Sequence, residues 1–332
     1  MTHDSQTPST EELERAAQQL TACRNELSKL FIGQKDLVDG VLRAVLAGGH
    51  VLVESVPGLG KTLLVKAVGK ILGLNTNRIQ FTPDLMPADI TGSHVFDLAE
   101  RKFVFHRGPI FTQFLLADEI NRAPAKTHAA LLEVMQERQV TLDGRHHALS
   151  PPFLVMATQN PIENEGTYAL PEAQLDRFLF KLEMSYPGEM DEQRILGLHL
   201  SGSSPERILS EEVQTVLNTE DVIGLQQIAS RLTVDHSIVV YITSIVRRTR
   251  GYPGLFMGAS PRAGIAMLAA GRAAALTYGR SYVTPDDIAE VALAALRHRV
   301  ILSPEAEVEG KHVDGVLKEL IKSVEVPRGT RG

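Results

Sequence analysis

The sequence lacks several features that are typical of secreted, zinc-binding or membrane-spanning proteins. It holds one cysteine, Cys23, so neither an intrachain disulfide nor a cysteine-rich zinc site can form, and a reducing compartment is expected. Its polar first residues lack the apolar segment of a secretion signal. No apolar run approaches the roughly 18 residues needed to cross a bilayer. We therefore expect a cytoplasmic protein without membrane insertion.

An excess of positive charge is also missing. Lys and Arg number 34 against 40 Asp and Glu, which gives a formal net charge of −6. This balance disfavours an indiscriminate binder of nucleic acid or membrane surfaces. The content of 43% hydrophobic and 22% charged residues is that of an ordinary globular protein and argues against wholesale disorder. At about 150 residues per domain, the length predicts two domains.

Short apolar runs alternate with helical patterns from residue 50 to residue 184. The first run, 50–54, leads into a glycine-rich segment, and a helical pattern follows at 61–72. Because strands that alternate with helices usually pair in parallel, the pattern predicts an α/β fold with a parallel sheet flanked by helices. Further strands are expected at 78–82, 113–117, 153–158 and 178–184, and helices at 125–138 and 171–176.

Two segments interrupt this alternation. In residues 139–150, alternating Val140 and Leu142 precede the turn pair Asp143–Gly144, which predicts a hairpin, and residues 97–110 are also strand-like. After residue 187 the strand pattern ends. We therefore predict an α/β domain over residues 1–187, including helices at its start, and an all-α domain over residues 188–332. The later helices are expected at 190–200, 221–232, 236–250, 261–278 and 285–298.

A glycine-rich loop joins the first strand to the helix after it. In such a loop, successive backbone N–H groups and the positive end of the helix form a concavity for phosphate oxygens. The lysine would neutralise the β- and γ-phosphates of a nucleotide, and the hydroxyl after it would bind Mg²⁺. The pattern predicts a triphosphate site at Ser55, Val56, Pro57, Gly58, Leu59, Gly60, Lys61 and Thr62.

Ser55 stands where the general phosphate-loop pattern, G-x-x-x-x-G-K-[ST], has glycine. Serine lacks the freedom of glycine at positive φ, so the loop must begin at ordinary dihedral angles or carry strain of about 1 to 3 kcal/mol. We expect phosphate binding to survive in either case. A glycine-rich connection that binds nothing is the alternative, which the strand before the loop and the helix after it disfavour.

The strand expected at 113–117 delivers two adjacent carboxylates, Asp118 and Glu119, at its carboxyl end. Ligands of α/β folds bind at this edge of the sheet. Asp118 is expected to hold Mg²⁺, directly or through water, and Glu119 to polarise the attacking water. A solvated acidic pair at the end of a strand is the alternative, and the phosphate loop makes it the weaker one.

Several runs of residues resemble the MoxR family of AAA+ ATPases. The similarity extends from Phe31-Ile32-Gly33-Gln34 to the helical part, although usual members have glycine at the position of Ser55. The resemblance implies that residues 1–187 form an AAA+ nucleotide-binding domain, that residues 188–332 form a helical lid, and that the protein hydrolyses ATP with Mg²⁺. Besides the phosphate loop, the runs are Gln-Phe-Leu-Leu-Ala-Asp-Glu-Ile-Asn-Arg at 113–122, Ala-Thr-Gln-Asn-Pro at 157–161 and Leu-Pro-Glu-Ala-Gln-Leu-Asp-Arg-Phe at 170–178.

The resemblance gives roles to three further polar residues. Asn160 takes the sensor-1 position and would orient the lytic water, while an Asn-Pro turn is the alternative. Arg177 resembles the arginine finger that reaches a neighbouring subunit's γ-phosphate, worth ~10³ to 10⁵ in rate. An ion pair with Asp176 competes with that role. Arg262 resembles sensor 2, which contacts the γ-phosphate of its own subunit, and a surface charge is the alternative.

The resemblance also implies contacts with the base and with partners. Phe31, Ile32 and Gly33 match the adenine-contacting segment, although they would also suit an ordinary core. The inserts around residues 85–110 and 139–150 fall where the family couples its nucleotide state to a client. The family forms rings, for which six subunits are expected, with chaperone-like assembly or activation of a partner that carries a von Willebrand factor A domain.

Three other functions remain open at this point. A nucleic-acid-stimulated AAA+ motor would use the local cluster of Arg247, Arg248 and Arg250, but the acidic total disfavours it. A chelatase-like motor subunit is the second. The third is a nucleotide-dependent scaffold that does not hydrolyse, and Glu119 and Asn160 argue against it because a scaffold needs no residues for a lytic water.

Overall fold

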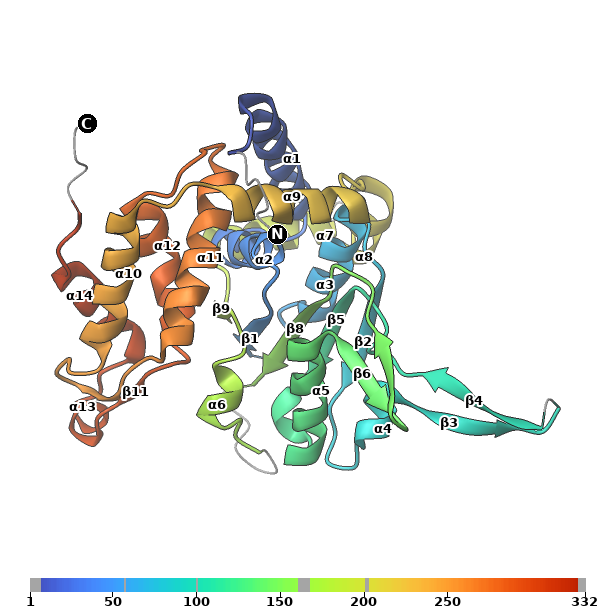
Figure 1. The fold of residues 1–332 in the computed structure, drawn as a ribbon. Helices are drawn as coiled ribbons and strands as arrows, with labels where there is room; N and C mark the ends of the chain where they lie inside the picture. Colours follow the sequence, from blue (N-terminus) through green and yellow to red (C-terminus); the bar gives the residue numbers. More distant parts are fainter. Residues whose placement is uncertain (1–6, 57, 100, 161–167, 201–202, 328–332) are drawn as a thin grey trace.

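The molecule is built around a five-stranded sheet (Figure 1). In the computed structural model the strands lie in the order β2-β5-β8-β1-β9, and every neighbouring pair is parallel. The strands are β1 (Val51–Ser55), β2 (Thr76–Gln80), β5 (Phe114–Asp118), β8 (Leu154–Gln159) and β9 (Phe180–Met184). The structure describes residues 7–56, 58–99, 101–160, 168–200 and 203–327.

The inner strands are apolar on both faces, so the sheet has a core on each side. Val51 and Val53 of β1 join one core, whereas Leu52, between them, joins the other. This alternation follows from the two-residue period of a strand. The first face is covered by α1 (Thr10–Ser28), α2 (Lys35–Leu46) and α3 (Lys61–Ile71), and the second by α4 (Pro87–Thr91), α5 (Ala125–Glu137) and the 3-10 turn η1 (Ile120–Arg122).

Helix α1 begins at a capping box. The Ser9 hydroxyl accepts from the Glu12 N–H at 3.1 Å, and Glu12 Oε2 accepts from the Ser9 N–H at 2.8 Å. Its buried stripe, spaced by three and four residues, contains the single cysteine. Burial raises the pKa of the Cys23 thiol to about 12, so Cys23 serves as a packing residue.

After β9 the chain is mainly helical: α10–α14 lie on the β9 side of the sheet, whereas α7, α8 and α9 lie near α2 and α3 (Figure 1). Helices α11 and α12 pack very closely, because a Cβ on Gly271 would lie 2.4 Å from Ile288 Cδ1. Each begins with proline behind a capping hydroxyl, Ser260 or Thr284. The helices are α6 (Glu172–Leu175), which precedes β9, and α7 (Glu189–Leu200), α8 (Pro205–Arg207), η2 (Ile208–Glu212), α9 (Thr219–Arg231), α10 (His236–Thr249), α11 (Pro261–Thr277), α12 (Pro285–Leu296), α13 (Pro304–Val308) and α14 (Val313–Ser323).

Both inserts are antiparallel hairpins, and they touch each other. The longer one, β3 (Gly92–Asp97) with β4 (Lys102–Arg107), projects away from the helical part, and the shorter one is β6 (Gln139–Leu142) with β7 (Arg145–Ala148) (Figure 1). His94 Nδ1 lies 2.8 Å from Asp143 Oδ2. The ring centroids of Phe105 and His147 are 4.4 Å apart. The two inserts therefore form one connected unit.

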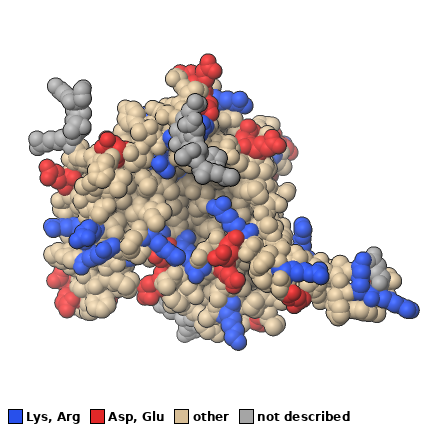
Figure 2. Space-filling model, in the orientation of Figure 1, with Lys and Arg blue, Asp and Glu red and all other residues tan. Residues whose placement is uncertain are grey.

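The outer half of the β3–β4 hairpin carries apolar and basic side chains outside the body of the protein. Phe96, Leu98 and Phe103 are 45%, 84% and 68% exposed. Arg101 and Lys102 are exposed beside them, and Figure 2 shows basic side chains at this end of the molecule. A hairpin of this kind cannot bury its side chains by itself, so it presents a contact surface.

The predicted fold class is confirmed, and the predicted ends of most elements shift by one or two residues. Two details differ. Ala99 and Arg101, placed in a strand by the sequence pattern, lie in the turn between β3 and β4, and the helical part contains one short antiparallel pair, β10 (Leu255–Met257) with β11 (Ile301–Leu302). Within the described ranges, every helix is too short or too polar to span a bilayer. The domain boundary at residue 187 stays a prediction.

Candidate functional site

The phosphate loop lies between β1 and α3. Gly58 and Gly60 have φ values of +85° and +84°, a left-handed conformation that glycine adopts without strain. Gly60 is also the residue before α3, and no described side chain caps the helix there. The first N–H groups of α3 are therefore available to an anion at the positive end of the helix. Pro57 lies outside the described residues.

Ser55, where the chain departs from the phosphate-loop pattern, is the last residue of β1. It pairs with Met184 of β9 and is 2% exposed. Its hydroxyl donates to the carbonyl of Val56 at 2.8 Å. Because a strand residue has an extended backbone, the loop begins at dihedral angles that serine adopts without strain.

The carboxylate of Asp118 is nearly buried and is surrounded by donors. Thr158 Oγ1 donates to Oδ1 at 2.6 Å, and Arg78 Nη2 donates to Oδ2 at 2.7 Å. Lys61 Nζ lies 4.0 Å from Oδ1. The structure thus brings the loop lysine and the strand-end carboxylate together at the carboxyl edge of the sheet.

Glu119 adopts a left-handed conformation, with φ of +55°. Its N–H donates to Thr158 Oγ1 at 2.9 Å, and its Oε2 accepts from Gln80 Nε2 at 2.7 Å and from Arg122 Nη1 at 3.0 Å. A residue other than glycine in this region costs about 1 to 3 kcal/mol and persists where its surroundings hold it. Both its backbone and its carboxylate are held here beside Asp118.

Asn160 directly follows β8 and is 5% exposed. The last residue of β8, Gln159, pairs with Glu54, the neighbour of Ser55. Asn160 therefore lies at the sheet edge that carries the phosphate loop. Pro161, on which the alternative of a simple Asn-Pro turn depends, lies outside the described residues.

The groups at this edge fit a Mg²⁺ ion bound together with phosphates. Mg²⁺ prefers oxygen ligands and is usually held by one or two protein oxygens, water and substrate phosphates. Thr62 supplies a hydroxyl in the first turn of α3, and Asp118 supplies a carboxylate. Lys61, the neighbour of Thr62 in the chain, has its ammonium 4.0 Å from Asp118 Oδ1, so the first turn of α3 lies beside this carboxylate.

The residues matched to adenine contact lie in the turn between α1 and α2. Phe31, Ile32 and Gly33 line one cavity of about 350 Å³, and Phe31 is 7% exposed. Gln34 Nε2 donates to the carbonyl of Ser185 at 2.7 Å, one residue past the end of β9. This bond ties the turn to the sheet edge that carries the phosphate loop.

A second group of predicted residues lies at the other end of the sheet. Arg177 and Arg262 line one cavity with residues 48–50, which precede β1. Because β1 has five residues at about 3.3 Å each, about 16 Å separate this end from the phosphate loop. The cavity has a volume of about 440 Å³, and its other lining residues are Ala47, Met135, Gln136, Arg138, Asp176, Leu179, Ile265, Ala266, Ala269 and Arg299.

The position of Arg262 differs from the expectation that it contacts the γ-phosphate of its own subunit. The reason is the placement of α11, whose first residues dock beside α6. Ser260 Oγ donates to Asp176 Oδ2 at 2.8 Å, which brings the start of the helix to the amino end of β9. Arg262 consequently lies on the side of Arg177 and not on the side of the phosphate loop.

Arg177 is held by a helix of the sheet domain. Its Nη1 donates to the carbonyl of Leu132 in α5 at 2.8 Å, and its Nε is buried without a partner among the described residues. Asp176, the competing partner, pairs with Arg299, whose Nε lies 2.7 Å from Oδ1. Burial lowers the pKa of Arg299 and the bond to Asp176 raises it, so the guanidinium stays charged.

Sequence reasoning missed three of these residues. Arg78 and Gln80, two positions apart on β2, lie on one side of the strand and hold Asp118 and Glu119. The two-residue period of a strand could have identified them once β2 was placed beside β5. Arg299 gives no local signal of its role, because the Asp176 carboxylate it binds lies 123 positions earlier in the chain.

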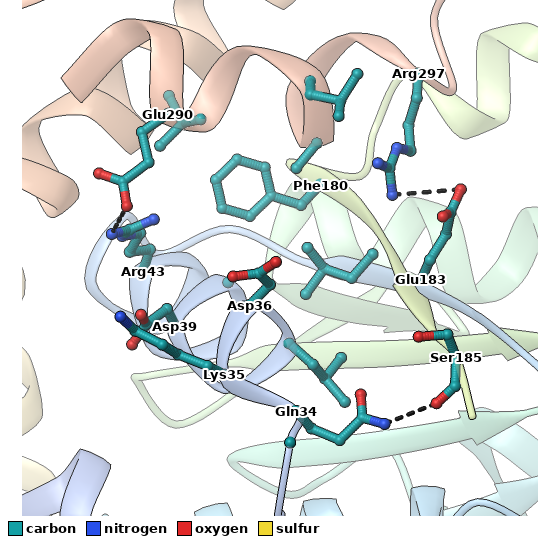
Figure 3. A pocket seen from close by; sticks show the side chains of 17 residues that line it. Gln34, Lys35, Asp36, Asp39, Arg43, Phe180, Glu183, Ser185, Glu290 and Arg297 are labelled. Atoms are coloured by element: carbon teal, nitrogen blue, oxygen red, sulfur yellow. Dashed lines mark hydrogen bonds and ion pairs between the residues drawn. The ribbon is translucent and has the colours of Figure 1, made fainter. Parts of the chain in front are cut away.

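A further cavity, of about 540 Å³, lies between α2, β9 and α12 (Figure 3). Ion pairs join its walls: Arg43 Nη2 lies 2.6 Å from Glu290 Oε1, and Arg297 Nη1 lies 3.5 Å from Glu183 Oε1. Gly33 lines both this cavity and the one at the adenine-contact turn. The lining of the larger cavity includes none of the predicted catalytic side chains.

Comparisons with known proteins identify the class. Residues 50–180 match the family described as ATPase family associated with various cellular activities (AAA), and residues 247–320 match the AAA lid domain. Together with the phosphate loop and the parallel sheet, these matches define an AAA ATPase with a helical lid.

The particular family follows from the relatives. The chain is 44% identical over 312 residues to Chaperone MoxR1 of Mycobacterium tuberculosis, covering 91% of this chain and 81% of that protein. It is 46% identical over 301 residues to the uncharacterized protein YeaC of Bacillus subtilis, covering 91% and 92%. A crystal structure of a proposed ATPase from Cytophaga hutchinsonii superposes with a TM-score of 0.87 at 38% identity, over 96% of this chain and 98% of that one. The chain belongs to the MoxR family of AAA+ ATPases.

Proposed function

We propose that this protein is a Mg²⁺-dependent ATP hydrolase whose active sites lie between the subunits of a ring. The observation that carries the proposal is the separation of two half-sites. The phosphate loop and its carboxylates lie at one end of β1, and Arg177 and Arg262 lie at the other end. Arg177 and Arg262 lie far from the phosphate loop of their own subunit. In a head-to-tail ring, each subunit would present them to the nucleotide bound by the next subunit. Six subunits are the expected number.

At the loop end, each side chain has a distinct task. Lys61 and the N–H groups of the loop would hold the β- and γ-phosphates, while Thr62 and Asp118 would hold Mg²⁺. When bound, the ion screens the charge of the phosphates. Glu119 would polarise the attacking water, and Asn160 would orient it for in-line attack. Phosphoryl transfer needs little beyond this positioning and charge stabilisation.

From the neighbouring subunit, Arg177 and Arg262 would stabilise the charge that develops on the γ-phosphate. Because Arg262 lies on the side of Arg177, we propose that it serves the adjacent subunit's nucleotide in place of that of its own subunit. Within each subunit, Phe31, Ile32 and Gly33 would contact the adenine, since their turn is tied to the sheet edge of the loop.

We further propose that hydrolysis drives chaperone-like assembly or activation of a partner protein with a von Willebrand factor A domain. Two observations support the chaperone-like role: the relative named Chaperone MoxR1, and the projecting β3–β4 hairpin with its exposed Phe96, Leu98 and Phe103. The contact of His94 with Asp143 links this hairpin to the one that precedes β8, so the two inserts would move together.

A mixing experiment tests the shared site. Lys61→Ala subunits, which keep the arginines, are combined with Arg177→Ala subunits, which keep the loop, and ATP turnover is measured. In a 1:1 mixture about a quarter of the interfaces combine an intact loop with an intact arginine, so two inactive proteins should regain activity. In the control, the Lys61→Ala partner is replaced by a Lys61→Ala, Arg177→Ala double variant, and no activity should return. Equal rates in both mixtures would rule out the neighbour-supplied arginine.

A further inference from the structure

The arginine cavity contains a single carboxylate at the meeting point of three segments. Among its described lining residues four are arginines, and Asp176 is the one acid. Asp176 Oδ1 accepts from Arg299 Nε at 2.7 Å, and Oδ2 accepts from Ser260 Oγ at 2.8 Å. Both carboxylate oxygens therefore bind residues of the lid, although Asp176 itself precedes β9.

Arg299 clamps the segment that carries Arg177. It is 6% exposed, and besides Asp176 Oδ1 it donates to three carbonyls of this segment, Asp176 O at 3.1 Å, Phe178 O at 2.6 Å and Leu179 O at 3.2 Å. A fourth bond, to Ala295 O, ties it to the last turn of α12. The three carbonyls of the segment lie on both sides of Arg177. A planar guanidinium with several fixed bonds restricts this backbone far more than a single contact would.

Ser260 makes the corresponding connection to Arg262. Its hydroxyl donates to Asp176 and accepts from the N–H of Arg262 at 3.1 Å, which caps the first turn of α11. The Ser260 side chain thus links the Asp176 carboxylate to the backbone of Arg262. Asp176 is also the residue directly before Arg177 in the chain.

We propose that Asp176 is a positioning residue that fixes Arg177 and Arg262 relative to each other, so that the lid and the sheet domain present both arginines as one unit to the next subunit's nucleotide. The inference rests on the proposed function and adds to it. Without such bonds, the segments that carry the two arginines would lose considerable conformational entropy when the arginines bind a triphosphate. The bonds of Asp176 to Arg299 and Ser260 order these segments beforehand, which lowers that entropic cost.

The geometry separates this role from simple charge neutralisation of Arg177. The guanidinium of Arg177 donates to Leu132 O, and the ion pair of Asp176 is with Arg299. Asp176 therefore acts on Arg177 through the backbone held by Arg299. Replacement by asparagine keeps the size of the side chain but leaves the buried Arg299 without its counter-charge, which loosens the clamp.

The principal test measures ATP binding and turnover of Asp176→Asn in assembled rings. We expect kcat to fall about tenfold or more, while the Kd for ATP changes less than about twofold, because the loop is a strand length away. In a double variant that already carries Arg177→Ala and Arg262→Ala, the addition of Asp176→Asn should lower kcat by less than about twofold. A larger additional loss would show that Asp176 acts elsewhere and would overturn the inference.

A matched control separates positioning from stability. Asp287 is a buried carboxylate of the lid, 1% exposed, that pairs with Arg280 and caps α12. Asp287→Asn should lower the melting temperature to a similar extent as Asp176→Asn but leave kcat of assembled rings within about twofold of wild type. An equal loss of kcat in both variants would assign the effect of Asp176 to stability and overturn the proposal.

A second pair of variants covers the case in which Asp176→Asn fails to fold. Ser260→Ala removes the hydroxyl that joins Asp176 to Arg262 and should lower kcat about threefold or more, whereas Ser260→Thr should restore it to within about twofold. Wild-type kcat in Ser260→Ala would overturn the proposed link. If Arg177→Ala and Arg262→Ala themselves turn over ATP normally, the shared site is wrong. If they are impaired while Asp176→Asn is not, only the present inference is wrong.

Discussion

The two ends of the central sheet hold their charged residues in different ways. At the phosphate-loop end, the residues come from the carboxyl ends of neighbouring strands and from the first turn of α3, which follows β1 directly. At the arginine end, they come from α5, α6, α11 and the end of α12, and contacts between the lid and the sheet place them. The loop end depends on the sheet and on α3, which carries Lys61, whereas the arginine end depends on how the lid docks.

The largest effect should come from the loop itself. Lys61→Ala removes the cation beside Asp118 and the phosphates, so calorimetry should detect no ATP binding at concentrations that saturate the wild type. Lys66→Ala, an exposed lysine of the same helix, is the matched control and should bind normally. Retained binding in Lys61→Ala would remove the basis for placing the triphosphate at this end.

A smaller but clear loss of activity should follow when Glu119, proposed to polarise the attacking water, is replaced. Glu119→Gln keeps the shape of the side chain but lowers its basicity, so turnover should fall about 100-fold or more while ATP binding remains. Single-turnover hydrolysis and nucleotide affinity are the measurements, with the exposed Glu137→Gln as control. Loss of binding and turnover together would mean that Glu119 holds the loop end together and does not serve the chemistry.

The arginine end should show an acid sensitivity of its own. His50, which lines that cavity, donates from Nε2 to Met135 O and accepts at Nδ1 from Val155 N, and burial lowers its pKa to about 4. As the pH falls, His50 is protonated near pH 6.5 in the unfolded chain but only near pH 4 in the folded protein. The free energy of unfolding therefore decreases as the pH falls from 6.5 toward 4. At pH 5 the loss is about 2 kcal/mol.

Thermal melts of the wild type between pH 8 and pH 5 measure this loss. His50→Gln should reduce the dependence on pH, whereas the exposed His236→Gln should leave it unchanged. Burial also lowers the pKa of His298, so part of the acid sensitivity should persist in His50→Gln. A wild-type melting temperature that does not decrease below pH 6.5 would contradict the prediction.

The smallest effect is expected for Ser55→Gly, which restores the general loop pattern. Because Ser55 is an extended strand residue, glycine relieves no strain there, and ATP affinity should change less than about threefold. Glycine in a strand should lower the free energy of unfolding by about 0.5 to 1 kcal/mol. Binding isotherms and denaturant melts would measure the two quantities. A large gain in affinity would show that the serine strains the loop.

The comparison of the two ends also explains what could be predicted from the sequence. The phosphate loop and the Asp118–Glu119 pair are contiguous, and the alternation of strands and helices places both at one edge of a parallel sheet. The fold class follows from the same alternation. Arg78 and Gln80 escaped notice because their role depends on which strand lies next to β5.

The placement of Arg262 could not be predicted, because it depends on where the lid docks. Local sequence identifies α11, its capping Ser260 and its proline, but it contains no information on the tertiary partner of that helix end. The bond to Asp176 and the clamp of Arg299 decide the position, and they join residues 84 and 123 positions from Asp176. Contacts of such long range become visible only in the folded chain.

The buried thiol in α1 has a practical consequence. A side chain that is 0% exposed, with a pKa raised to about 12, should not react with maleimide dyes at neutral pH. A second cysteine introduced by Leu98→Cys, at a position that is 84% exposed on the outer part of the long hairpin, would then be the one labelled position. Fluorescence from that single dye would follow the hairpin through each nucleotide cycle without prior removal of the native sulfur.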